Sequence, residues 1–453
     1  MTMISNRHFR NKIFITIVSV LFLLFFVNHS NREQQEKVKH EKKNILILCS
    51  YHENLVPTKR LVKGIINELN HKFPMEELEL YIEYMDTKRK YKPSSGDPDC
   101  INKNIDFEGT IFEELFALYR KKFLEGTNKT KFDVIISLDD NAWCFLVTYR
   151  NELFKGVPIV FCGLNYAEVK KEEFRKKLKE KKFNNYTGIF EMVSIKQTII
   201  LAKKLQPEIK EIYAINDYHT TTGRINSRLL KNIISDLNTD KSEYKDLKIT
   251  LNKDITLEEL KDELKSLPRK KSIVLLSGFN VDSKNNIFSY QESLREIYES
   301  SAVPIYGLAD HFLHYNDERE KKNYNSHGII GGKLLITENH GKRAAELASK
   351  ILNGESADEI PLIDEMTEDQ YEYRLDYNKL KKFEISLSKL EELKKQNYKI
   401  KVINEPLSFF KKYQKELTIT SVSFRKTGGG ACKRANFNCS FSPLFFHVSN
   451  HTK

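Results

Sequence analysis

The sequence lacks most of the short motifs that mark common enzyme and metal sites. No G-x-S-x-G, H-E-x-x-H or P-loop occurs, and the six cysteines include no C-x-x-C pair. These absences exclude the usual signatures of serine hydrolases, zinc proteases, P-loop nucleotidases and zinc ribbons. We therefore expect no catalytic residues, no metal site and no cofactor, and we expect that the protein is not an enzyme.

The cysteines also give no sign of a disulfide framework. Cys49, Cys144 and Cys162 lie in apolar runs, where a cysteine usually acts as a small buried hydrophobe. Cys432 and Cys439 are close enough in sequence to pair. We expect the three cysteines in apolar runs to be buried and structural.

Positive charge is concentrated at the two ends of the chain. The formal net charge is +12, but residues 1–43 and residues 418–453 each contribute +5. Residues 44–417 are therefore nearly neutral and offer no basic groove for phosphates. We expect no nucleic-acid partner, and basic ends on a neutral body favour a protein near a membrane.

A long hydrophobic run is also missing. The apolar segment from Ile13 to Val27 has only 15 residues, which is short for a spanning helix and typical of a secretion-signal core. No convincing cleavage site follows it, so we favour an uncleaved anchor over a cleaved signal peptide. Arg7, Arg10 and Lys12 precede the run and predict that the body is extracytoplasmic, with the chain attached to the cell membrane.

The body alternates strand-like and helix-like segments. Short apolar runs such as 44–49, 78–84 and 134–138 alternate with amphipathic stretches such as 58–69 and 112–123, and a second series covers 194–308. This pattern predicts an α/β fold with two doubly wound parallel-sheet lobes. The predicted parts are residues 1–30 as anchor or signal peptide, 31–43 as charged spacer, 44–165 plus 310–353 as lobe 1, 166–309 plus 354–415 as lobe 2, and 416–453 as an irregular tail.

Residues 132–165 carry the clearest pattern. A buried-type strand ends at Asp139 and Asp140, an amphipathic helix follows, and a second strand ends at Gly163-Leu164-Asn165. Such a strand–helix–strand unit is parallel, and ligands bind beyond the carboxyl ends of its strands. We therefore expect these strand ends to form half of a binding cleft.

Polar residues follow several other predicted strands. For each of them, turn formation or helix capping is an alternative to ligand contact, and an acid before a helix is often only a cap. The candidate ligand-binding residues are Ser50, Tyr51, His52, Asp86, Asp139, Asp140, Asn141, Gly163, Asn165, Asp217, Thr221, Gly278, Asn280 and Asp310.

Two further segments have alternative interpretations. Thr220-Thr221-Thr222-Gly223 begins a helix and either caps it or holds an anion. His311 and His314, with Asp317, are too loosely spaced for a metal site, and we expect a surface loop there.

Eight segments, in order, resemble one family. They are LILCSYHE (46–53), EYMDTKR (83–89), FDVIISLDDNA (132–142), GVPIVFCGLN (156–165), TGIFE (187–191), GIIGG (328–332), HGKRAAELASKILNGE (340–355) and INEPLSFFKKY (403–413). The chain resembles ABC transporter substrate-binding proteins of the type I periplasmic-binding fold. It is most similar to the version that serves as the extracytoplasmic sensor region of bacterial histidine kinases.

The resemblance implies a function. It implies an extracytoplasmic protein that binds a small molecule between two lobes, with an ABC permease or a sensor kinase as partner and hinge crossings at Tyr186–Glu191 and Ala309–Asp310. Receptor relatives continue into a second membrane helix and an output domain, which residues 418–453 do not contain. The alternative is therefore the ligand-sensing domain of a truncated sensor kinase, and an enzyme on the same scaffold is a third hypothesis.

Overall fold

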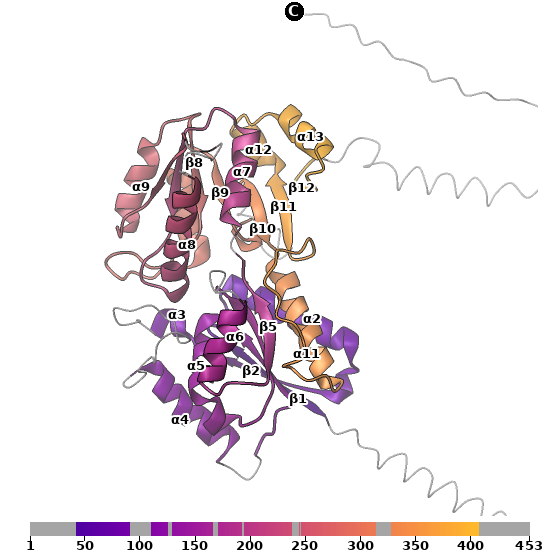
Figure 1. Ribbon diagram of the computed structural model, residues 1–453. Helices are drawn as coiled ribbons and strands as arrows, with labels where there is room; N and C mark the ends of the chain where they lie inside the picture. Colours follow the sequence, from indigo (N-terminus) through magenta and orange to yellow (C-terminus); the bar gives the residue numbers. More distant parts are fainter. Residues whose placement is uncertain are drawn as a thin grey trace, which may run out of the picture. The chain divides into compact units, whose positions relative to one another are not determined.

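The computed structural model describes residues 42–90, 110–125, 129–165, 171–192, 194–237, 244, 246–313 and 328–406. Within these ranges the chain forms two β-sheets covered by helices (Figure 1). Both sheets belong to one compact unit that ends at Ile403. None of the helices in the described ranges is long and apolar enough to cross a membrane. The predicted anchor and the tail from residue 416 lie outside these ranges.

The first sheet contains five parallel strands in the order β2-β1-β3-β4-β5. Its strands are β1 (Lys43–Cys49), β2 (Leu78–Tyr84), β3 (Val134–Leu138), β4 (Ile159–Leu164) and β5 (Tyr186–Phe190). Its connections contain α2 (Val56–Lys72), the 3-10 turn η1 (Met75–Glu77), α3 (Thr87–Lys90), α4 (Ile111–Phe123), α5 (Asp139–Leu153) and α6 (Lys171–Glu180).

Alternation along β1 shows why this sheet is covered on both faces. Ile45 and Ile47 face one hydrophobic cluster together with α2 residues, whereas Leu46 and Leu48 face a second cluster that includes Phe112 of α4. All four β1 side chains are fully buried. A parallel strand buried on both faces reads as a continuous apolar run, which is how β1 was recognisable in the sequence.

The second sheet contains seven strands in the order β12-β11-β10-β9-β8-β6-β7. They are β6 (Glu211–Ile215), β7 (Lys248–Leu251), β8 (Ser272–Leu276), β9 (Ile305–Gly307), β10 (Gly331–Leu335), β11 (Tyr371–Asp376) and β12 (Ile400–Ile403). β10 and β11 pair antiparallel, while the other pairs are parallel. This sheet is therefore mostly parallel, and it contains one antiparallel pair that the sequence did not indicate.

Helices cover both faces of the second sheet as well. One face packs against α7 (Ile195–Leu205), α8 (Thr221–Leu237) and α13 (Leu387–Lys395), and the other against α9 (Leu257–Ser266) and α10 (Tyr290–Ser300). A 3-10 turn η2 (Asp310–Phe312) follows β9, and α12 (Tyr377–Lys382) follows β11. Each sheet thus has its own pair of cores.

The strand memberships differ from the predicted division of the chain. β5 pairs with β4, so residues 186–190 lie in the first sheet although we assigned 166–309 to lobe 2. β10 pairs with β9 and β11, so the segment after Asp310 stays in the second sheet. Residue Ile363 bridges Ile189 beside β5. The chain therefore passes between the sheets after Phe190, after Leu335 and between Ile363 and Tyr371, and Ala309–Asp310 is not a crossing.

Cys144 also differs from expectation. It is disulfide-bonded, whereas Cys49 and Cys162 are free and buried. The burial of all three was predicted correctly. Burial alone gave no indication that one of them forms a covalent bond.

After β10 the chain returns to the first sheet through α11 (Thr337–Leu352), which lies beside α2 (Figure 1). The two helices approach closely because glycines face the contact. A Cβ on Gly341 would lie 2.2 Å from the carbonyl oxygen of Leu61, and a Cβ on Gly64 would lie 2.0 Å from that of Glu338. Neither position has room for a side chain.

We expect Gly341→Ala to destabilise the protein. Overpacking of this kind costs about 1–3 kcal/mol, and the higher helix propensity of alanine returns only about 1 kcal/mol of it. Urea unfolding measures the difference, with Gly278→Ala as the control because no atom lies within 4 Å of a Cβ there. Equal stability of the two variants would show that the helix contact is loose.

Candidate functional site

A cavity of about 70 Å³ lies where residues from both sheets meet. A single water occupies roughly 10–15 Å³ of such a cavity, so there is room for a small ligand or several waters. It is lined by Tyr51, Leu55, Pro57, Leu61, Asp139, Asn165, Glu191, Met192, Thr222, Asn226, Ser277, Tyr290, Leu308, Ala309, His311, Phe312, Leu335 and Thr337. The strand-end loops of the two sheets therefore enclose one space.

Three of the sequence-predicted residues line this cavity. Tyr51 follows β1, Asp139 begins α5 directly after β3, and Asn165 follows β4. Because β1, β3 and β4 are parallel neighbours, their carboxyl ends lie on the same edge of the sheet. This part of the site follows from the strand–helix–strand pattern.

Side chains at the cavity edge also join the two sheets. The contacts are Tyr51 Oη to Thr222 Oγ1 at 2.9 Å, Thr221 Oγ1 to Asn141 Oδ1 at 3.2 Å, Lys88 Nζ to Tyr290 Oη at 3.1 Å, and Arg60 Nη1 to Asp310 Oδ1 at 3.1 Å. Among the predicted residues, Asn141 and Thr221 therefore hold the two sheets together and do not line the cavity.

Asp139 has a strained backbone. Its φ is 66°, in the left-handed region that non-glycine residues rarely occupy. The neighbouring strand β4 leaves space for the Asp139 side chain because it has a glycine there: a Cβ on Gly163 would lie 3.0 Å from Asp139 Oδ1. Gly163 itself has φ 80° at a bulge in β4. Strain of this sort costs about 1–3 kcal/mol and often occurs at functional sites.

Ser50 and Asp140 have structural roles next to Asp139. Ser50 Oγ donates to the Leu138 carbonyl at 2.6 Å and accepts from the Ala142 amide at 2.8 Å, which satisfies a free N–H of α5. Asp140 accepts from the backbone and side-chain amides of Asn165 at 3.2 and 2.9 Å. Asp140 therefore orients Asn165, and does not itself line the cavity.

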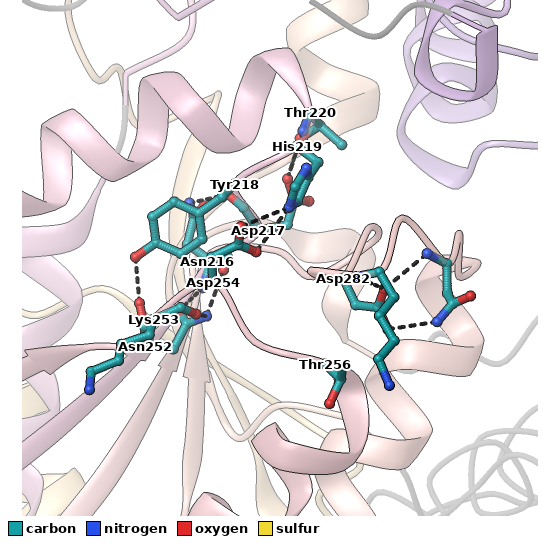
Figure 2. Close-up of polar contacts among 12 residues, drawn as sticks. Asn216, Asp217, Tyr218, His219, Thr220, Asn252, Lys253, Asp254, Thr256 and Asp282 are labelled. Carbon is teal, nitrogen blue, oxygen red and sulfur yellow. Dashed lines mark hydrogen bonds and ion pairs between the residues drawn. The ribbon is translucent and has the colours of Figure 1, made fainter. Parts of the chain in front are cut away.

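The polar residues of the loop after β6 form hydrogen bonds within that loop and with neighbouring loops (Figure 2). Asp217 Oδ1 accepts from the amide and hydroxyl of Thr220 at 3.1 and 2.6 Å, and its Oδ2 accepts from the Asn280 amide at 3.2 Å. Asn216 and Asn252 exchange two further hydrogen bonds. Asp217 and Asn280 thus fix the loops after β6 and β8, and neither lines the cavity.

The remaining predicted residues do not line the cavity. Asp86 is held by Arg89 through two contacts of 2.7 and 2.6 Å and is 3.4 Å from His52. Asp310 accepts from the amide and hydroxyl of Thr337, the first residue of α11. No atom of the described chain lies within 4 Å of a Cβ on Gly278.

Several lining residues were not predicted as contacts. Glu191 follows β5 at a passage between the sheets, Asn226 lies on the inner face of α8, and Tyr290 begins α10. His311, which we expected in a surface loop, lines the cavity from η2 with its ring 5.0 Å from that of Tyr290. Of these four residues, Glu191 carried the clearest signal in the sequence, because TGIFE places an acid directly after a strand.

Burial controls the ionisation of the acids in the cavity. Burial raises the pKa of Glu191 to about 8, with a further contribution from the charge of Asp140. Burial also raises the pKa of Asp139 well above its usual value, and Glu191 and Asp140 raise it further. The pKa of Asp140 rises only to about 6, because the amides of Asn165 oppose the effect of burial.

His311 is shifted in the opposite direction. Burial lowers its pKa well below the usual value, and the charges of Arg60 and Lys88 lower it further. The imidazole is therefore neutral at physiological pH. Within the described ranges, no group of three or more His, Cys, Asp or Glu side chains is arranged to hold a metal ion.

We expect Glu191→Gln to stabilise the ligand-free protein at pH 8 and to have little effect at pH 4.5. The folded pKa of about 8 exceeds the usual value of 4.5, so ionisation of Glu191 reduces stability as the pH rises between these values. Because Glu191 is partly exposed to the cavity, we expect a gain of about 1–3 kcal/mol at pH 8. Urea unfolding at both pH values measures it.

The control for this experiment is Glu53→Gln, which makes the same change at an exposed position. We expect that variant to differ from the parent by less than about 0.5 kcal/mol at either pH. A gain for Glu191→Gln that is equal at pH 4.5 and pH 8 would contradict the raised pKa.

No protein-family model matches the sequence, and no curated protein matches it. Solved structures do match. A conserved domain protein from Vibrio cholerae is 13% identical, with 80% of this chain and 99% of that chain covered and a TM-score of 0.50. An ABC domain from Streptococcus pneumoniae in complex with L-Trp is also 13% identical, with 80% and 100% covered and a TM-score of 0.50. At this identity the likeness shows the fold alone, so the chain shares their α/β fold.

Proposed function

We propose that the protein is an extracytoplasmic solute-binding protein that holds a small molecule between its two sheets. The observation that carries this proposal is the cavity, which is lined from both sheets by strand-end residues. A ligand there would contact both halves at once, as in proteins that close around their ligand by a hinge. The shared fold with an ABC domain that contains a bound amino acid agrees with such a role.

The bridging contacts support a closing mechanism. Two of the four are hydrogen bonds between neutral groups, each worth about 0.5–1.5 kcal/mol net, and the bond from the Lys88 ammonium to Tyr290 is worth about 1.5–3 kcal/mol. This is small enough for the halves to separate and admit a ligand. A ligand that adds contacts to both walls would favour the closed arrangement by its own differential affinity.

The disulfide at Cys144 supports the proposed location. Disulfides persist in oxidising environments such as the periplasm or the cell exterior and are rare in the cytosol. Together with the apolar run at 13–27, it favours a body outside the membrane. The membrane partner of the ligand-bound protein would then decide its role: an ABC permease would make it a transport protein, and a kinase would make it a sensor.

A thermal-shift screen of the purified protein tests ligand binding. A ligand at 100 times its Kd stabilises a protein by about 2.7 kcal/mol, so a true ligand raises the melting temperature measurably. We expect Asn226→Ala to weaken the affinity about 10-fold or more, because Asn226 lines the cavity.

Asn70→Ala serves as the control, because Asn70 is an exposed residue of α2. We expect it to leave the ligand-induced shift unchanged. A ligand whose affinity is the same for both variants binds elsewhere. A broad screen of amino acids, amines, sugars and nucleosides without any stabilising compound would count against a binding function.

Cell fractionation tests the proposed attachment. We expect the full chain to be recovered with the membrane fraction and to be digested by a protease added to intact spheroplasts. Deletion of residues 1–30 should move the protein to the soluble cytoplasmic fraction. Protection of the full chain from the protease would contradict an extracytoplasmic body.

A further inference from the structure

Two carboxyl groups line the cavity without a partner. Asp139 lies at the start of α5 and Glu191 directly after β5, and both line the cavity. Among the described residues, neither side chain forms a hydrogen bond or an ion pair. Both side chains are partly exposed to the cavity, and carboxylates in such largely apolar surroundings are normally paired or hydrogen-bonded, so these two groups have acceptor capacity that the described residues do not use.

Two amide oxygens in the cavity are also without partners. Asn165 is 5% exposed and Asn226 is 8% exposed, and the Oδ1 of each finds no hydrogen-bond partner in the described chain. Their amide nitrogens are occupied, since Asn165 Nδ2 donates to Asp140 Oδ2 at 2.9 Å and Asn226 Nδ2 donates to Ser277 Oγ at 2.9 Å. The free atom of each asparagine is therefore an acceptor. Both ring nitrogens of His311, which also lines the cavity, have no partner in the described chain either, and the neutral ring supplies one donor and one further acceptor.

The positive groups near the cavity are already engaged. No Lys or Arg is among the described residues that line it. Lys88 donates to Tyr290 Oη and lies 4.6 Å from the Tyr290 ring centroid and 5.3 Å from that of Tyr51. Arg60 is paired with Asp310. A ligand carboxylate would therefore meet two acids and no lysine or arginine in the lining.

We propose that the cavity binds the protonated amino group of an organic amine that has an apolar body and no carboxylate. An ammonium group has three donors and no acceptor, which matches the carboxyl groups of Asp139 and Glu191 and the free oxygens of Asn165 and Asn226. The apolar walls, including Leu55, Leu61, Met192, Leu308, Phe312 and Leu335, suit the rest of the molecule. The inference rests on the proposed binding function and specifies its ligand class.

Binding of the cation depends on ionised carboxylates. Glu191 faces the charge of Asp140, and Asp139 faces Glu191, Asp140 and Lys88. Tyr51, Cys49, Cys162 and Tyr371 also face these acids, and the pKa of each is raised, so all four stay neutral. In the ligand-free protein the pKa of Glu191 is about 8, so below pH 8 its carboxyl group is mostly protonated. Binding of the ammonium group at lower pH therefore requires that Glu191 lose this proton. The affinity should therefore rise between pH 6 and pH 8.

Isothermal titration with matched compounds tests the ligand class. The panel contains butylamine, benzylamine and phenethylamine, each with the corresponding alcohol, carboxylic acid and α-amino acid. We expect at least one amine to bind 10-fold or more tightly than its alcohol, acid and amino acid counterparts. We also expect its affinity to increase about 10-fold or more from pH 6 to pH 8, with protons released at pH 6.

Isosteric variants of the two acids complete the test. Asp139→Asn keeps the shape and tolerates the left-handed backbone, and Glu191→Gln keeps the length. Each should weaken amine binding 10-fold or more, and Glu191→Gln should reduce the pH dependence, since Asp139 remains to titrate. Glu53→Gln, which is exposed, should change neither. Melting temperatures of the variants confirm that they are folded.

The outcomes separate this inference from the binding function. If an alcohol, acid or amino acid binds as tightly as its amine, the amine assignment is wrong while the binding function stands. The same holds if no amine binds but another compound of the broad screen does. If no compound in either set binds, both proposals fail.

Discussion

The contact between α2 and α11 determines how the two sheets meet. α11 starts where β10 of the second sheet ends, yet it packs along α2 of the first. The packing depends on Gly64 and Gly341, where any side chain would collide with a backbone carbonyl. Asp310 binds the first residue of α11 and also pairs with Arg60 of α2. Leu61 and Thr337, one from each helix, line the cavity, so the helix pair forms part of its wall.

The individual strands and helices could be predicted well from the sequence, whereas the assignment of some of them to the first or the second sheet could not. Strands such as β1 and β3 were recognisable because burial on both faces leaves a continuous apolar run, and most helices showed an amphipathic repeat. The membership of β5 depends on which strand it pairs with, and the crossing after Leu335 depends on where α11 packs. Neither is a local property. The antiparallel pairing of β10 with β11 likewise involves residues about forty positions apart in the sequence.

The same limit explains the partial prediction of the site. The rule that ligands lie at the carboxyl ends of parallel strands placed Tyr51, Asp139 and Asn165 correctly in the cavity wall. It could not separate them from Asp140 and Asp217, because an acid that caps a loop and an acid that faces a cavity occupy the same sequence position. Lining residues on helices, such as Asn226, lie in ordinary amphipathic patterns and give no separate signal.

The unsatisfied groups in the cavity have a common physical meaning. A folded chain normally satisfies its buried polar atoms, and a lone exception has little significance. Here, among the residues that the structure describes, two carboxyl groups, two amide oxygens and the ring nitrogens of His311 lack partners around one space, and one of the acids is held in a strained backbone. The two carboxylates and the two amide oxygens are acceptors when the acids ionise, so one cation with several N–H donors would satisfy them together. The same event would add contacts across the two walls, which couples recognition of the ligand to closure of the halves.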